Sequence, residues 1–85
     1  MPVEDYLDRR RYQLLAAIVE AVERKVGSTA ARPEDIGEEL GLTADEIQEY
    51  TTYWTDKGCL KALDRYSVVI TADAIDIVDD AEANQ

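Results

Sequence analysis

The side chains best suited to meet a partner lie close together in residues 43–57, TADEIQEYTTYWTDK. Acidic, amide and hydroxyl groups recur in this stretch at intervals of three or four residues, which places them on one face of a helix. The residues of this face are Asp45, Gln48, Glu49, Thr52 and Asp56, with Tyr53 at its flank. The spacing therefore predicts one polar face, which is either offered to a partner molecule or simply solvated.

Groups that could perform catalysis or hold a metal are scarce. There is no His, and the single cysteine, Cys59, allows neither an internal disulfide nor a multi-cysteine zinc site. No Ser or Cys stands at a recognisable spacing from a base, and neither a Gly-rich phosphate loop nor a calcium-loop pattern occurs. We therefore expect a protein that is not an enzyme and that has no cofactor and no metal site.

The composition predicts a small globular chain. Its 85 residues correspond to one domain with a modest core, and a hydrophobic share of 46% is ordinary for a folded protein. No apolar run approaches the roughly 18 residues that a membrane span needs, and the N-terminus lacks the apolar segment of a signal peptide. We therefore expect a cytoplasmic protein without a membrane partner.

The charge is strongly acidic. Nineteen acidic and nine basic residues give a net charge of −10, which repels phosphate backbones and favours basic partners or solubility. Adaptation to a salt-rich cytoplasm is a second explanation, because proteins in that setting are rich in acids and poor in lysine, and salt screens their charge. The only lysines are Lys25, Lys57 and Lys61. Both explanations remain open.

The first predicted element is an amphipathic helix over residues 5–26. Its apolar side chains form one stripe, which consists of Leu7, Leu14, Leu15, Ile18, Val19, Val22 and Val26. Arg11 falls within the stripe, so either its side chain snorkels to solvent or the helix begins as a looser arm. Gly27, which follows the basic Arg24 and Lys25, predicts the end of the helix and the start of a loop.

Arg9, Arg10 and Arg11 form the only basic run. They can contact a phosphate at the start of the first helix, or pair with Asp5 and Asp8 on the same helix. The spacing favours pairing within the helix.

A short second helix is predicted over residues 33–40. Pro33 fits its first position. Ile36 and Leu40, one turn apart, are expected to be buried, and Gly41 is expected to end the helix.

The third helix is predicted over residues 43–57. Thr43 and Glu46 have the spacing of a capping box, in which each residue satisfies the backbone N–H of the other. Gly58 ends the helix. The side chains expected to face the core are Ile47, Tyr50, Thr51 and Trp54.

A hairpin and a last helix complete the chain. Residues 59–71 contain two short runs of β-forming residues, joined at residues 64–66, and the second run is β-branched. Thr71 is expected to cap a helix over residues 72–82.

The order of these elements resembles that of a winged helix-turn-helix domain. The segment EDIGEELGLTADEI resembles the helix-turn-helix core of bacterial and archaeal transcription regulators, and YWTDKGCLKAL resembles their exit into the wing. YSVVITADAIDIVDD resembles a frequent ending of such domains, although Ala74 stands where that ending usually has Gly and the wing is very short. The resemblance covers residues 5–82. It implies a mainly α fold with a small β-hairpin: a three-helix core, a short wing and a C-terminal helix in one domain, residues 1–85.

A winged helix that binds DNA places its third helix in the major groove. The resemblance then makes Ala44, Gln48 and Thr52 the candidates for base contacts and puts Arg65 of the wing near a phosphate. Gln pairs with adenine and Thr can meet a thymine methyl group. We therefore expect a non-catalytic DNA-binding transcription regulator that acts through the exposed face of its third helix.

The charge of the same face favours a different partner. Asp45 and Glu49 would approach phosphates at a cost, and Tyr53, if exposed, is the kind of aromatic residue that anchors protein contacts. The alternative is therefore an acidic winged helix used for protein–protein interaction or for homodimerisation through its first or last helix, with no DNA binding. The candidate partner-binding residues for both hypotheses are Ala44, Asp45, Gln48, Glu49, Thr52, Tyr53 and Arg65.

Overall fold

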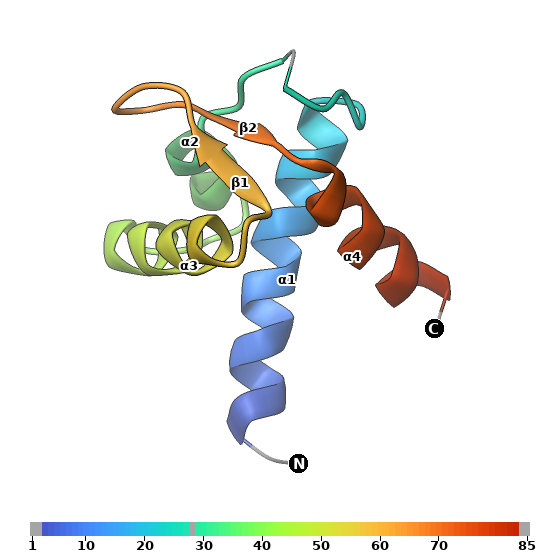
Figure 1. The fold of residues 1–85 in the computed structure, drawn as a ribbon. Helices are drawn as coiled ribbons and strands as arrows, with labels where there is room; N and C mark the ends of the chain where they lie inside the picture. The colour runs from blue at the N-terminus through green and yellow to red at the C-terminus, as the bar shows by residue number, and fades with distance from the viewer. Residues whose placement is uncertain (1–2, 28, 84–85) are drawn as a thin grey trace.

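The structure is a computed structural model that describes the backbone of residues 3–27 and 29–83 and the side chains of residues 9–27 and 29–83. Within these residues it is mainly helical with a small antiparallel hairpin, as the sequence predicts. The elements are α1 (Val3–Ala21), α2 (Pro33–Glu39), α3 (Ala44–Asp56), β1 (Leu60–Ala62), β2 (Val68–Ile70) and α4 (Ala72–Ala83) (Figure 1). This architecture is compatible with a winged helix.

The other helices pack against α1. Figure 1 shows α1 running through the molecule, with α3 on one side and α4 on the other, and α1 contacts α2, α3 and α4. Its predicted apolar stripe is buried as far as residue 22, with at most 1% of each side chain exposed: Leu14, Leu15, Ile18, Val19 and Val22. The side chain of Leu7, on the same predicted stripe, lies outside the described residues.

The end of α1 differs from the prediction, which extended this helix over residues 5–26. The helix ends at Ala21, and the chain then turns in a Schellman motif, in which the Arg24 N–H donates to the Val19 carbonyl at 3.1 Å. Glu23 and Arg24 have positive φ angles of 53° and 63°, a region that usually favours Gly. The prediction was wrong because it reserved this turn for Gly27.

The early end of α1 lets the next residues pair with the hairpin. Val26 forms a parallel bridge with Ile70, and the Gly27 N–H donates to the Ile70 carbonyl at 3.1 Å. Ala31 and Val68 exchange two backbone hydrogen bonds of 2.8 and 2.9 Å. Val26, predicted on the buried stripe, is consequently 51% exposed. The segment between α1 and α2, predicted as a loop, therefore lines the second edge of β2.

The hairpin lies within residues 59–71, as predicted. β1 pairs antiparallel with β2, and Leu60 lies opposite Ile70. All three residues of β2 are buried, as expected for a strand with a neighbour at both edges. The hydroxyl of Thr71, predicted to cap α4, donates to the Gly58 carbonyl at 2.6 Å. Thr71 therefore ties the end of the hairpin to the end of α3.

The predicted glycine turn joins α2 to α3. Gly41 has a φ of 80°, and the Leu42 N–H donates to the Gly37 carbonyl at 2.9 Å. Leu40, predicted to be buried, is 42% exposed, because α2 ends before it and Leu42, which follows the turn, is the leucine that joins the core. Gly37 allows α2 to lie close to α3, since a Cβ at this position would clash with the side chain of Ile47.

Glu23→Gly tests the left-handed ending of α1. Gly adopts a positive φ without the steric penalty of a Cβ, so the variant should gain roughly 0.5–1 kcal/mol in free energy of unfolding. Urea unfolding followed by circular dichroism measures the change. Glu20→Gly, at an exposed position inside α1, is the control and should lose about 1 kcal/mol. A loss at both positions would mean that α1 continues through Glu23.

Candidate functional site

Glu46 holds the first turn of α3 in place. The predicted capping box is present: the Thr43 hydroxyl accepts from the Glu46 N–H at 3.2 Å, and the Glu46 carboxylate accepts from the Thr43 N–H at 3.0 Å. The same carboxylate lies 3.0 Å from the Arg10 guanidinium and accepts from the Tyr50 hydroxyl at 3.4 Å. The Thr43 N–H is the largest cause that holds the pKa of Glu46 below its ordinary value, and Arg10 adds to it.

Two residues of the basic run in α1, Arg10 and Arg11, contact α3. Arg10 pairs with Glu46, and the backbone carbonyl of Arg11 accepts from the Trp54 indole N–H at 2.7 Å. The side chains of Asp5 and Asp8, the predicted partners of this run, lie outside the described residues.

Buried side chains on one side of α3 determine how the helix is turned. Ile47, Tyr50 and Trp54 are buried, as predicted, and the Trp54 indole donates a hydrogen bond to the backbone of α1. Thr51, predicted to join them in the core, is only partly buried. With its apolar side against α1, α3 presents its polar side to solvent and to the hairpin.

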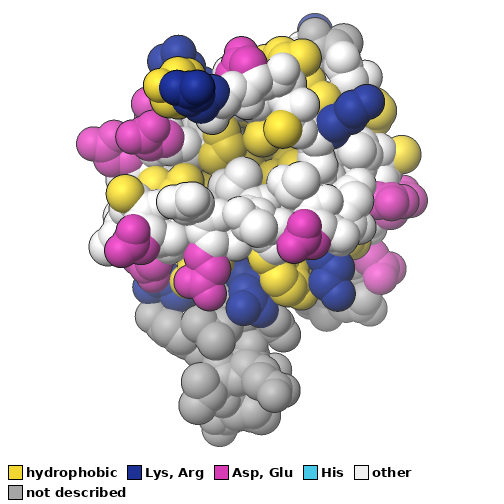
Figure 2. All heavy atoms as spheres, turned by 60° about the vertical axis from the view of Figure 1, so that its left-hand side comes forward, with side chains coloured by type: hydrophobic (Ala, Val, Ile, Leu, Met, Phe, Trp, Pro, Cys, Tyr) yellow, Lys and Arg dark blue, Asp and Glu magenta, His cyan; other side chains and the backbone are white. Residues whose placement is uncertain are grey.

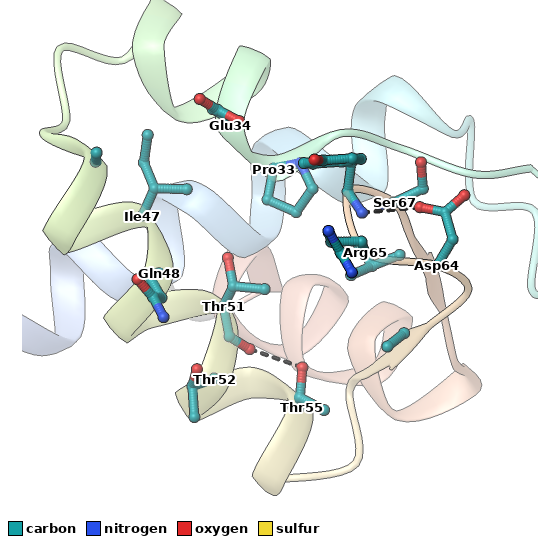
Figure 3. A pocket seen from close by; sticks show the side chains of 14 residues that line it. Pro33, Glu34, Ile47, Gln48, Thr51, Thr52, Thr55, Asp64, Arg65 and Ser67 are labelled. Atoms are coloured by element: carbon teal, nitrogen blue, oxygen red, sulfur yellow. Dashed lines mark hydrogen bonds between the residues drawn. The ribbon is translucent and has the colours of Figure 1, made fainter.

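A cleft of about 420 Å³ opens between α3, the hairpin and the start of α2. Apolar side chains, among them Ile47 and Val68, contribute to its lining. Figure 2 shows hydrophobic surface in a hollow at the centre of this face, uncharged surface beside it and acidic side chains nearer the edges. In Figure 3, Arg65 of the hairpin lies across the cleft from the polar side chains of α3.

The cleft divides the predicted partner face into two sides. Four of the seven candidate residues line the cleft: Ala44, Gln48, Thr52 and Arg65. The other three are not part of its lining: Asp45, Glu49 and Tyr53. The cleft side of α3 therefore carries neutral residues. The neighbouring side, called the acidic side below, consists of Asp45, Glu49 and Asp56, all of them exposed.

The charged groups of the cleft come from α2 and the hairpin. Glu34, Asp64 and Arg65 are the charged residues among the described residues that line it. The Asp64 carboxylate accepts from the backbone N–H groups of Tyr66 and Ser67, both at 2.8 Å, and so shapes the hairpin tip. These bonds, the one from Tyr66 first, hold the pKa of Asp64 below its ordinary value.

Two threonines outside the predicted partner face also line the cleft. Thr51 lies seven residues after Ala44 and Thr55 lies seven residues after Gln48, so their helical spacing was the signal that could have found them. The Thr55 hydroxyl donates to the Thr51 carbonyl at 2.8 Å. The Thr51 hydroxyl oxygen is buried and has no hydrogen-bond partner among the residues that the structure describes.

Tyr53 does not form an open aromatic surface. It is partly buried, with the Arg11 guanidinium carbon 4.3 Å and the Lys57 ammonium 5.5 Å from the centre of its ring. Its ring meets that of Trp54 edge to face at 4.9 Å. Arg11 thus snorkels from the apolar stripe of α1, which is one of the two arrangements expected for it.

Comparison with known proteins gives no assignment. No family model, no curated protein and no solved structure matches this chain. In the part of the chain that the structure describes, no helix is long and apolar enough to cross a membrane. The same residues contain no group of three or more side chains that could hold a metal ion. The candidate site therefore rests on the geometry of α3 and the hairpin.

Glu46→Gln tests the ionised carboxylate at the start of α3. Because the folded-state pKa of Glu46 is lowered, this carboxylate stabilises the fold above its unfolded-state pKa, and the contribution is lost as pH falls through the folded-state pKa. The variant should therefore be less stable than the wild type near pH 7, and the difference should shrink toward about pH 3. Urea unfolding at both pH values measures it.

Glu49→Gln is the matched control, because it removes the same charge from an exposed position of α3 outside the capping box. A deficit of Glu46→Gln that is as large at low pH as at neutral pH would contradict a role for the ionised carboxylate.

Proposed function

We propose that this chain is a winged helix-turn-helix module of a DNA-binding transcription regulator, and that it contacts duplex DNA through the cleft side of α3 and the hairpin. The observation that carries the proposal is the division of α3 into two sides. The cleft side presents Gln48, Thr52 and small neighbours without a carboxylate of α3, and Arg65 lies across the cleft. Amides and hydroxyls contact base edges in the major groove, and Arg contacts phosphates.

The arrangement of elements supports this proposal. A capped α3 follows the glycine turn after α2, and the hairpin follows α3 directly. This is the order in which a winged helix presents a recognition helix and then a wing. The acids of α3 that argued against DNA, Asp45 and Glu49, lie outside the cleft lining.

The alternative is an acidic winged helix that binds a protein and no DNA. The exposed acidic side of α3 favours it, together with the net charge of −10. A row of carboxylates suits a basic protein surface and speeds its association. The two hypotheses therefore use different sides of the same helix, and variants on each side distinguish them.

Titration of a labelled, mixed-sequence duplex tests the proposal. Fluorescence anisotropy should show binding at about 50 mM salt that weakens as salt is added, because phosphate contacts release counterions. Arg65→Ala should lower the affinity and reduce the slope of log K against log salt by about one. Lys25→Ala, which removes the same charge from an exposed position outside the cleft lining, should leave both nearly unchanged.

The fold must be checked at each salt concentration, because repulsion among the acidic side chains destabilises the folded state when salt is low. Circular dichroism at each salt concentration shows whether the helices persist. Absence of binding by the folded protein at low salt would overturn the proposal and leave protein binding. If Arg65→Ala and Lys25→Ala lower the affinity for the duplex equally, the cleft is not the DNA-binding site.

Neutralising the acidic side of α3 distinguishes the two partners. Asp45→Asn combined with Glu49→Gln lessens repulsion between α3 and the phosphates, so affinity for the duplex should rise about two- to tenfold. The same anisotropy titration measures it. Asp73→Asn with Asp76→Asn on α4 changes the net charge equally at positions outside the cleft lining and should have a smaller effect. Weaker binding of the α3 variant would contradict the proposed approach of DNA.

A further inference from the structure

The cleft side of α3 carries a narrow set of chemical groups. It presents methyl groups, hydroxyls and one amide, from Ala44, Gln48, Thr51, Thr52 and Thr55. No Lys or Arg occurs in α3, so this helix lacks the side chains that most often pair with guanine O6 and N7. The exposed carboxylates of α3, which could accept from the cytosine amino group, belong to its acidic side, whereas Glu34 and Asp64 line the cleft from α2 and the hairpin. What remains on the cleft side matches adenine and thymine.

We propose that the cleft side of α3 reads A·T base pairs in the major groove, with Gln48 pairing with adenine and the methyl groups of Ala44, Thr52 and Thr55 packing against thymine methyl groups. This inference rests on the proposed function and names the base pairs that the module selects. The Gln amide offers one donor and one acceptor in a plane, which matches adenine N6 and N7.

The positions of these side chains suit the assignment. Gln48 is exposed and lies one helical turn from both Ala44 and Thr52, so a methyl group stands on each side of the amide along α3. Figure 3 shows Gln48, Thr52 and Thr55 along the same helix. Since the Thr55 hydroxyl donates to the backbone of α3, its methyl group is the part best able to meet a partner.

The length of the cleft side limits the number of base pairs that it can reach. From Ala44 to Thr55 the helix rises about 16 Å. At about 3.4 Å per base pair, this corresponds to roughly five base pairs. Arg65 is the only Arg among the described residues that line the cleft, and it belongs to the hairpin. It serves as the phosphate contact, so it should strengthen binding to every sequence equally.

Four duplexes with identical flanks and different cores test the inference. The cores of about six base pairs contain A·T pairs in mixed order, G·C pairs, A·U pairs, which lack the thymine methyl group, or inosine·cytosine pairs. An inosine·cytosine pair presents the guanine pattern in the major groove, but it lacks the amino group that marks guanine in the minor groove. Anisotropy competition at one salt concentration should rank the A·T core first. The A·U core should bind several-fold more weakly, and the G·C and inosine·cytosine cores about tenfold more weakly.

Variants assign the preference to α3. Gln48→Ala should reduce the ratio of A·T to G·C affinity about tenfold, because it removes one bidentate pair. Gln13→Ala, the same substitution at an exposed position of α1, should leave the ratio unchanged. Arg65→Ala should lower the affinity for all four cores by the same factor.

Several outcomes would overturn the inference. An inosine·cytosine core bound as tightly as the A·T core would mean that the minor groove is read instead. Equal affinity for all four cores, or an A·T preference that Gln48→Ala leaves intact, would refute base reading by α3 while the proposed DNA binding stands. If the folded protein binds none of the duplexes, the proposed function and the inference fail together.

Discussion

Burial of Ile47, Tyr50 and Trp54 against the rest of the core decides how α3 is turned about its axis, and the chemistry of the cleft depends on that rotation. Burying a large apolar side chain contributes about 2 kcal/mol, so turning α3 by one residue position would sacrifice several such contributions. It would also break the hydrogen bond between the Trp54 indole and α1. Such a turn would carry carboxylates toward the hairpin and Gln48 toward the core. The neutral character of the cleft side is thus a consequence of packing on the opposite side.

Arg10 and Arg11 of α1 also hold α3 in this orientation. Arg10 pairs with Glu46, the residue that also closes the capping box, and Arg11 covers the ring of Tyr53. The sequence allowed a phosphate contact or pairing within α1 for this basic run, because both follow from local spacing. Contacts with α3 join residues more than thirty positions apart in the chain. No local rule predicts which distant residue an Arg will meet.

Residue type and spacing predicted those features of the fold that depend on neighbouring residues in the sequence. The capping box at Thr43, the turn at Gly41 and the alternation of helices and hairpin follow from residue type and spacing, and the structure has them. The end of α1 was missed because Glu23 adopts a left-handed conformation that usually favours Gly, and because the pairing of the following residues with β2 is a contact between distant parts of the chain. The spacing predicted the polar face of α3, but it did not predict that this face divides into a cleft side and an acidic side. A helical wheel groups Asp45 with Gln48, and only the position of the hairpin separates them.

The separation changes what the net charge means for binding. At about 0.15 M salt the screening length is about 8 Å, so a partner in the cleft feels mainly the charges close to it. α4, with its four aspartates, lies on the other side of α1 from α3 in Figure 1, and one of these acids, Asp79, is already paired with Arg24. Among the described residues that line the cleft, the charged ones are Glu34, Asp64 and Arg65, and the acidic side of α3 adjoins them. At about 1 M salt, where screening acts within about 3 Å, direct contacts decide, and on the cleft side of α3 these contacts are neutral. The strongly acidic composition of the chain is therefore compatible with the proposed contact between base edges and the cleft side of α3.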